Sequence, residues 1–127
     1  MARKTFFPNP DNKPVGYSPA TRVGDAVFAS GHVSVDAAGN VVGEGDAGAQ
    51  SEQVFSNVEA ALKAAGATMA DVTKITCFLV DVADYDAYAA VRLRLFPENG
   101  PASSTVVVKE LVKPEYLVEI EAIAVVG

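Results

Sequence analysis

The chain lacks the residues that a disulfide scaffold, a metal centre or a membrane segment would need. Cys77 is the only cysteine, so no internal disulfide can form, and a reducing cytoplasm is the predicted location. His32 is the only histidine, and no pattern of cysteine and histidine has metal-ligand spacing. The N-terminal apolar pair Phe6-Phe7 is too short for a signal-peptide core, and no apolar run approaches the roughly 20 residues of a membrane-spanning helix. We therefore expect a cytoplasmic protein with no metal and no membrane partner.

Basic residues are also scarce. Lysine and arginine together number 10 against 16 aspartates and glutamates, and the formal net charge is −6. Arg92 and Arg94 form a close basic pair, and most other basic residues are scattered along the chain. Because phosphate binding depends on clustered lysine and arginine side chains, this composition argues against a nucleic-acid partner.

The chain nevertheless has enough apolar residues to fold. Half of its 127 residues are hydrophobic, which argues against disorder. It shows no internal repeat, low-complexity tract or interdomain linker, so residues 1–127 are predicted to form one domain. A domain of this size can bury a real core, although oligomerisation would stabilise it further.

Hydrophobic periodicity predicts two helices. The first covers residues 47–65, with Asp46 as its N-cap. The second begins after Asp81 or Asp84 and continues to about Phe96. Their apolar stripes are Val54, Phe55, Val58, Ala61, Leu62 and Ala65 in the first helix, and Tyr85, Tyr88, Val91 and Leu95 in the second.

Runs rich in β-branched residues, separated by turn signals, predict the strands. Gly24-Asp25 suits the turn of a hairpin between the first two. The predicted strands cover residues 17–22, 26–30, 72–82, 104–110 and 117–126. Their order around the helices predicts an α+β fold with both helices on one face of the sheet.

The last predicted strand carries two carboxylates in an otherwise apolar segment. Alternation sends Glu119 and Glu121 to one face of the sheet and apolar side chains to the other, which can pack against helices. Because an unpaired buried charge is costly, the carboxylate face needs water, a partner subunit or a ligand. This strand therefore predicts a site on the face opposite the helices.

Several segments of the chain, in their order and spacing, resemble the RidA/YjgF/YER057c/UK114 family, which are small trimeric deaminases of reactive enamines and imines. They cover residues 16–20, 27–32, 57–62, 64–66, 72–76, 78–81 and 118–124. The resemblance implies a single mixed sheet of about six strands with two helices on one face. It also implies a homotrimer with a barrel-like core, in which the open sheet faces meet and small-molecule ligand clefts lie between subunits.

The resemblance further implies a reaction. Family members hydrolyse a 2-enamine or 2-imine acid to a 2-keto acid and ammonia without metal or cofactor, because a protonated imine is already electrophilic. The protein holds the substrate, positions a water molecule and assists proton transfer. Glu119 matches the family glutamate that orients or activates this water. The other interpretation of Glu119 is a subunit-interface carboxylate satisfied by backbone amides or a lysine.

Further residues match family positions around the substrate. Tyr17 matches a tyrosine that donates a hydrogen bond or walls the cleft, and its alternative is an ordinary aromatic packed under the proline-rich loop. Ser30 and Gly31 match a Ser-Gly step, in which the glycine either lets a ligand approach the backbone or permits a bulge. His32 stands where the family often has glutamine, and it serves either as an acid or base or as a structural residue.

One feature of the family is missing. The deaminases grip the substrate carboxylate with an arginine in a Pro-Ala-Arg-Ser segment, and this chain has Ser103 at that position. A hydroxyl cannot reproduce a charge-assisted bidentate pair. Thr105 stands where some relatives have cysteine, and Ala89 replaces an asparagine that lies near the site in some relatives. Together these changes favour a less anionic ligand, unless another cation such as Arg22 or Lys109 substitutes.

Three functions are therefore weighed. The first is cofactor-free hydrolysis of a small reactive enamine or imine, with Glu119 positioning water and Tyr17, Ser103 and Thr105 binding the ligand. The second is a trimer that binds a small, largely neutral metabolite without deaminating it. The third is a ribonuclease or translation inhibitor, a label that some relatives carry. It is the least favoured, because the chain is acidic and lacks a basic and aromatic surface pattern.

Overall fold

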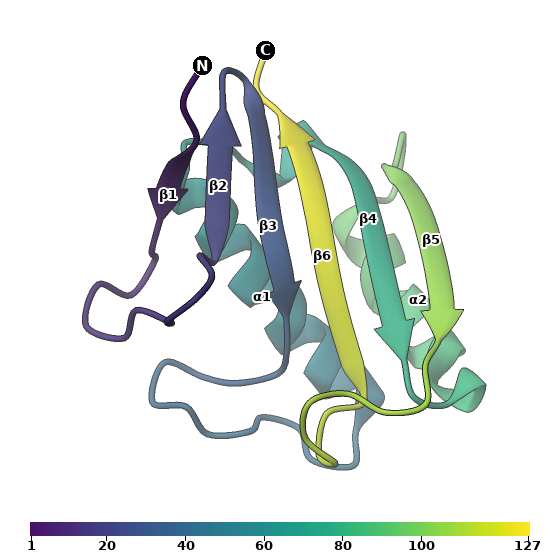
Figure 1. The fold of residues 1–127 in the computed structure, drawn as a ribbon. Coiled ribbons are helices and arrows are strands. Elements are labelled where there is room, and N and C mark those ends of the chain that lie inside the picture. The colour runs from purple at the N-terminus through teal and green to yellow at the C-terminus, as the bar shows by residue number, and fades with distance from the viewer.

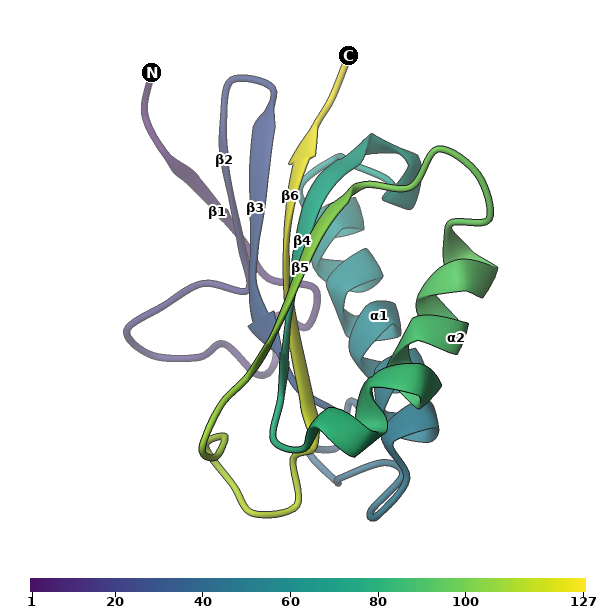
Figure 2. The same ribbon diagram turned by 90° about the vertical axis from the view of Figure 1, so that its right-hand side faces the viewer.

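Two helices pack against one face of a six-stranded mixed sheet in the computed structural model, which describes residues 1–127 (Figures 1 and 2). This arrangement confirms the predicted α+β class. Short 3-10 turns precede β4 and α2, at Met69–Asp71 and Val82–Asp84. The strands are β1 (Lys4–Phe6), β2 (Ala20–Val23), β3 (Ala26–His32), β4 (Val72–Leu79), β5 (Ala102–Val107) and β6 (Val118–Val125), and the helices are α1 (Ala47–Ala64) and α2 (Tyr85–Leu95).

The strand order in the sheet is β1-β2-β3-β6-β4-β5, so the last strand of the chain lies in the middle. All neighbouring strands are antiparallel except β4 and β5. These two run parallel because α2 connects them as a crossover. The predicted hairpin is present, and its turn residue Gly24 has a φ of 57°, a conformation that glycine adopts without strain. Strand β1 was not predicted.

Helix α1 forms where the periodicity predicts it. Asp46 caps its N-terminus, because the Asp46 side chain accepts a hydrogen bond from the Ala49 amide at 3.0 Å. Gly66, with a φ of 85°, lies just beyond its last turn. Every member of the predicted apolar stripe of this helix is buried against the sheet. That face carries the core of the molecule.

Helix α2 lies within its predicted bounds, since it begins directly after Asp84 and ends at Leu95, with Phe96 as its C-cap. Asp81 accepts from the Ala83 amide and caps the preceding 3-10 turn, whereas Asp84 makes no capping hydrogen bond. Of the predicted stripe, Leu95 is wrong, because 45% of it is exposed. The chain leaves the helix at Phe96, and the Phe96 ring turns inward to meet the Phe55 ring edge-on.

The sheet face without helices, called the open face below, is covered by no other helix or strand (Figure 2). The predicted alternation of β6 is confirmed, since its apolar residues are buried under the helices while Glu119 and Glu121 lie on the open face. Phe28 and Val106, from β3 and β5, are 42% and 44% exposed on the same face. The loop between β1 and β2 projects from this side of the sheet (Figure 2).

Candidate functional site

The Glu119 carboxylate lies against the backbone of Gly31 on the open face. Strand β3 carries an irregularity between Ala29 and His32, where it pairs with β6. A Cβ atom added to Gly31 would lie only 2.5 Å from Oε2 of Glu119. The structure therefore brings the predicted carboxylate and the predicted glycine together, and the carboxylate occupies the space that a side chain at position 31 would fill.

The surroundings of Glu119 change its proton affinity. Burial, together with the charge of Glu121, raises the pKa of the Glu119 carboxyl above its ordinary value. Neither carboxylate forms an ion pair with a lysine or arginine of the chain. A carboxyl group with a raised pKa and no counter-ion can accept and return a proton closer to neutral pH than an ordinary glutamate.

A surface hollow next to Gly31 brings in two more predicted residues. Tyr17 and His32 line it together with Pro19, and Tyr17 is 62% exposed. Burial lowers the pKa of His32, so the ring is neutral at physiological pH. Nε2 of His32 lies 3.3 Å from the Pro19 carbonyl oxygen, which can only accept, so Nε2 carries the ring proton.

Ser30 anchors the loop that carries Tyr17. The Ser30 hydroxyl donates a hydrogen bond of 2.6 Å to the carbonyl of Ser18. The Ser30 amide donates to the carbonyl of Pro19. Since the hydroxyl proton is used within the chain, the direct contribution of Ser30 is to hold this loop against β3.

Ser103 and Thr105 lie on the other side of the sheet from Glu119. Strand β5 begins two residues earlier than predicted, so Ser103 lies inside it. The parallel register pairs Ser103 with Ile75 and Thr105 with Cys77, both of which point toward the helices. Within one chain, the predicted site is thus divided between the open face and the helix side of the edge strand.

Arg92, which sequence reasoning left out of the site, lies directly beside Ser103. Its Nη1 donates to the Ser103 hydroxyl at 3.2 Å, and its Nη2 donates to the Tyr85 hydroxyl at 3.0 Å. The guanidinium also lies 5.2 Å from the centre of the Tyr88 ring. One signal was available, because Tyr85, Tyr88 and Arg92 share a helical face and the arginine interrupts an apolar stripe.

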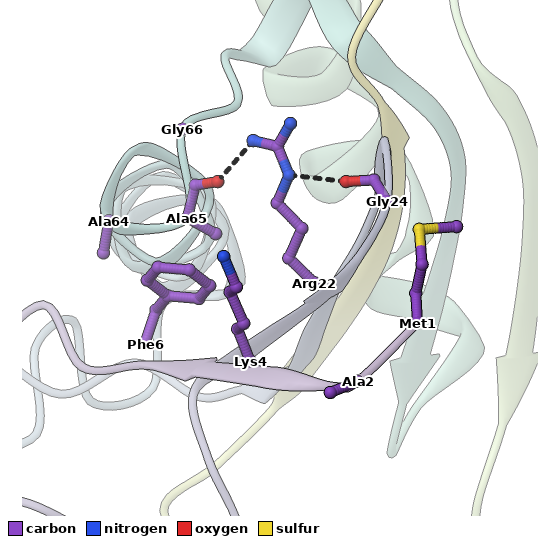
Figure 3. A pocket seen from close by; sticks show the side chains of 9 residues that line it. All are labelled: Met1, Ala2, Lys4, Phe6, Arg22, Gly24, Ala64, Ala65 and Gly66. Carbon is purple, nitrogen blue, oxygen red and sulfur yellow. Dashed lines mark hydrogen bonds between the residues drawn. The ribbon is translucent and has the colours of Figure 1, made fainter.

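The sequence suggested Arg22 and Lys109 as substitute cations, but the Arg22 guanidinium is already bound within the chain. Figure 3 shows its guanidinium donating to the carbonyls of Ala65, at the end of α1, and Gly24, in the hairpin turn, at 2.9 and 2.8 Å. Asp25 lies within ion-pair distance of the same group. Arg22 thereby links the C-terminal end of α1 to β2, and together with Lys4 it lines a surface hollow. Lys109, the other candidate, lies beyond the far end of β5 from Ser103.

No group of three or more histidine, cysteine, aspartate or glutamate side chains in residues 1–127 is arranged to hold a metal ion. Neither α1 nor α2 combines the length and the hydrophobicity that crossing a membrane requires.

Comparison with known proteins identifies relatives along nearly the whole chain. The model of the family described as endoribonuclease L-PSP matches residues 11–126. The 3-aminoacrylate deaminase RutC of Acinetobacter baylyi is 39% identical over 125 residues, which cover 98% of each chain. The 2-iminobutanoate/2-iminopropanoate deaminase of Dermatophagoides farinae is 37% identical over 115 residues, 90% of this chain and 89% of that protein. A crystal structure of a conserved Rid-family protein from Yersinia pestis has a TM-score of 0.90 at 31% identity, covering 98% of this chain and 100% of that one.

Proposed function

The chain belongs to the endoribonuclease L-PSP family, also known as the RidA/YjgF family, and we propose that it deaminates a small reactive enamine or imine by cofactor-free hydrolysis. The observation that carries the proposal is the Glu119 carboxylate, which lies over Gly31 on an open face, has a raised pKa and has no counter-ion. The two named deaminases among its relatives support the same reaction class.

The proposed chemistry needs only one acid–base group. A proton from solvent first converts the substrate to the iminium ion, by adding to the carbon of an enamine or to the nitrogen of an imine. Water adds to the electrophilic carbon while Glu119 accepts a proton from it, which gives a carbinolamine. Glu119 then returns the proton to the nitrogen, the C–N bond breaks with its electron pair leaving on ammonia, and the remaining hydroxyl releases its proton to solvent as it becomes the carbonyl of the product.

The other predicted residues take supporting roles in this proposal. Tyr17 closes one side of the hollow and offers its phenol as a hydrogen-bond donor. Gly31 leaves room for the Glu119 carboxylate, and Ser30 keeps the Tyr17 loop in place. His32 is neutral and bound to the loop through Nε2, so its role is to shape the hollow rather than to transfer protons.

We further propose that the working unit is a homotrimer with its clefts between subunits. Glu119 and Ser103 lie on opposite sides of one sheet, so a ligand can contact both only if two copies contribute. The β5 edge of one subunit, with Ser103 and Thr105, would then face the open face of the next. Phe28 and Val106, which are partly exposed on the open face, would be covered in this assembly.

Substituting Glu119 tests the reaction. An amino-acid oxidase supplies 2-imino acids, and semicarbazide traps those that are not hydrolysed, so less semicarbazone means more deamination. Removing a general base costs about a hundredfold to ten-thousandfold in rate, so Glu119→Gln should reduce activity by that factor. Glu121→Gln is the matched control, because it removes the neighbouring carboxylate from the same strand face without removing the proposed base.

The controls separate the possible failures. Full activity in Glu119→Gln would contradict the assignment of the base. A wild-type protein that is trimeric but deaminates neither imino acids nor aminoacrylate would point to the metabolite-binding alternative. Light scattering that shows a stable monomer at micromolar concentration would contradict the proposed cleft between subunits.

A further inference from the structure

Arg92 forms no ion pair with an aspartate or glutamate of the chain. Its guanidinium donates to two neutral acceptors, the hydroxyls of Ser103 and Tyr85. None of the ion pairs of the chain includes it, whereas Arg94, two residues further along α2, is paired with Glu52. Two hydroxyls cannot neutralise a guanidinium, so the charge of Arg92 is available to an incoming anion.

The surrounding side chains hold this charge in place. The guanidinium carbon lies 5.7 Å from the centre of the Tyr85 ring and 5.2 Å from that of the Tyr88 ring, within the range of cation–π attraction. The hydrogen bond from Arg92 to the Tyr85 hydroxyl raises the pKa of Arg92, so the group stays charged at any working pH. Tyr88 is fully buried next to it, and the Tyr88 hydroxyl has no hydrogen-bond partner in the chain.

Space is available beside the cation. A surface hollow of about 540 Å³ is lined by Arg92, Tyr85, Ala89 and Ser103. Ala89 and Ser103 are small, so neither fills the volume in front of the guanidinium. The hollow is large enough for a small organic acid and lies at the β5 edge, where Ser103 was expected to contact the substrate.

We propose that Arg92 binds the carboxylate of the substrate, and that α2 thus supplies the cation that strand β5 lacks at Ser103. This inference rests on the proposed deaminase function, because it names the substrate of that same site as an acid. A planar guanidinium matches a carboxylate through two parallel hydrogen bonds, and such a pair is stronger than the bonds to hydroxyls that it would replace. A less anionic ligand was expected from the sequence because three site positions differ from the family, and Ser103 was treated as the loss of a charge.

The position of Arg92 also determines which subunit contributes each residue to the proposed site. Arg92 lies on the helix side of the sheet and Glu119 on the open face. A substrate whose carboxylate is held by Arg92 of one copy is therefore hydrolysed by Glu119 of another.

A binding experiment tests the inference without relying on turnover. The probes are 2-oxobutanoate, a stable keto acid, and its neutral counterpart 2-oxobutanamide, titrated calorimetrically into the assembled protein. The wild type should prefer the acid. Arg92→Gln should weaken acid binding by about tenfold to a hundredfold, the loss expected for a charge-assisted pair, and leave amide binding unchanged. Arg92→Lys should recover part of the preference, because the charge returns without the planar fork.

Arg94→Gln is the matched control, since it removes an arginine from the same helix that is already paired with Glu52. It should leave the affinity for both probes unchanged. Acid binding that is absent, that equals amide binding in the wild type, or that falls equally in both arginine variants would overturn the inference.

Failure of this inference is distinguishable from failure of the proposed function. If the acid binds through Arg92 but no imine is hydrolysed, the inference stands and the deaminase proposal falls. If hydrolysis is unaffected by Arg92→Gln, the deaminase proposal stands and the inference falls. Co-expression of Glu119→Gln and Arg92→Gln chains adds a check, because random mixing makes about a quarter of the clefts wild type in a shared-site oligomer. Recovery of activity in the mixture is expected, and inactive mixed oligomers would contradict the assignment of the two residues to different subunits.

Discussion

Replacing Gly31 with alanine should separate the activity of this protein from its stability. The added Cβ would lie 2.5 Å from Oε2 of Glu119, 2.9 Å from its Cδ and 3.2 Å from its Cγ. An ordinary contact between such atoms is about 3.5 Å, so the carboxylate has to move by about 1 Å. The Glu119 side chain is flexible at this end and Gly31 does not have a positive φ, so the backbone accepts alanine.

The size of each effect follows from this geometry. Displacing a catalytic group by about 1 Å can cost about a hundredfold in rate, so Gly31→Ala should lose roughly that much of the proposed deaminase activity. Its free energy of unfolding should change by no more than about 1 kcal/mol, because alanine also reduces the conformational freedom of the unfolded chain.

Two measurements on the same preparation decide the matter, namely the semicarbazone assay and denaturant unfolding. Gly48→Ala is the control, because the nearest atoms to its added Cβ are at 3.4 and 3.9 Å and it lies in the first turn of α1, away from the carboxylate. It should keep full activity. Gly31→Ala with wild-type activity would refute the argument that the position of the carboxylate against Gly31 matters. A large loss of stability would show that Gly31 is needed for folding instead.

The remaining predictions concern proton affinity, the core and the relocated cation. Because the charge of Glu121 helps to raise the pKa of Glu119, Glu121→Gln should lower that pKa and move the acid limb of the pH–rate profile to lower pH. An acid limb that does not move in Glu121→Gln would contradict the attribution of the raised pKa to Glu121. The raised pKa also means that the protonated form of Glu119 stabilises the fold, so this stabilisation is present at low pH and is lost as pH rises through the pKa of the folded protein. Leu62→Ala should lower the free energy of unfolding by about 2–4 kcal/mol through the cavity under α1, and an unchanged denaturation midpoint would show that the packing is misassigned. Ser103→Arg alone should help little, because two guanidinium groups would then adjoin, whereas Ser103→Arg combined with Arg92→Gln should restore acid binding lost in the single Arg92 variant. Titration with 2-oxobutanoate measures this, and a combined variant that binds no better than Arg92→Gln would count against the shared position.

Much of the fold was predictable because it depends on local order along the chain. The apolar stripe of α1 and its cap at Asp46 are encoded within a few helical turns, and the structure confirms both. The alternation in β6 likewise follows from a period of two, whatever the strand pairs with. Predictions failed where the signal was short or ambiguous. Three-residue β1 has no detectable period, and Leu95 lies where the helix stops.

The candidate site was predictable only in part. Glu119 could be placed on the uncovered face from the pattern of its own strand. Its contact with Gly31 could not, because that contact depends on how β3 and β6 pair around the irregularity. Arg92 was visible as a basic residue in an apolar stripe, but nothing in the spacing says that it reaches Ser103 on a strand that follows the helix.

By itself, the sequence determined the helices, the buried faces and the presence of two carboxylates on an uncovered strand face, because side-chain periodicity is a local property. Only the tertiary structure decided the neighbours of each functional group. Strand register and the parallel pairing of β4 with β5 set Ser103 on the side opposite Glu119 and beside Arg92. Register is settled by packing summed over the whole sheet, in which a shift of one residue would turn every side chain to the other face. That is the physical reason why a position that looks like a lost charge in the sequence has an arginine beside it in the folded protein.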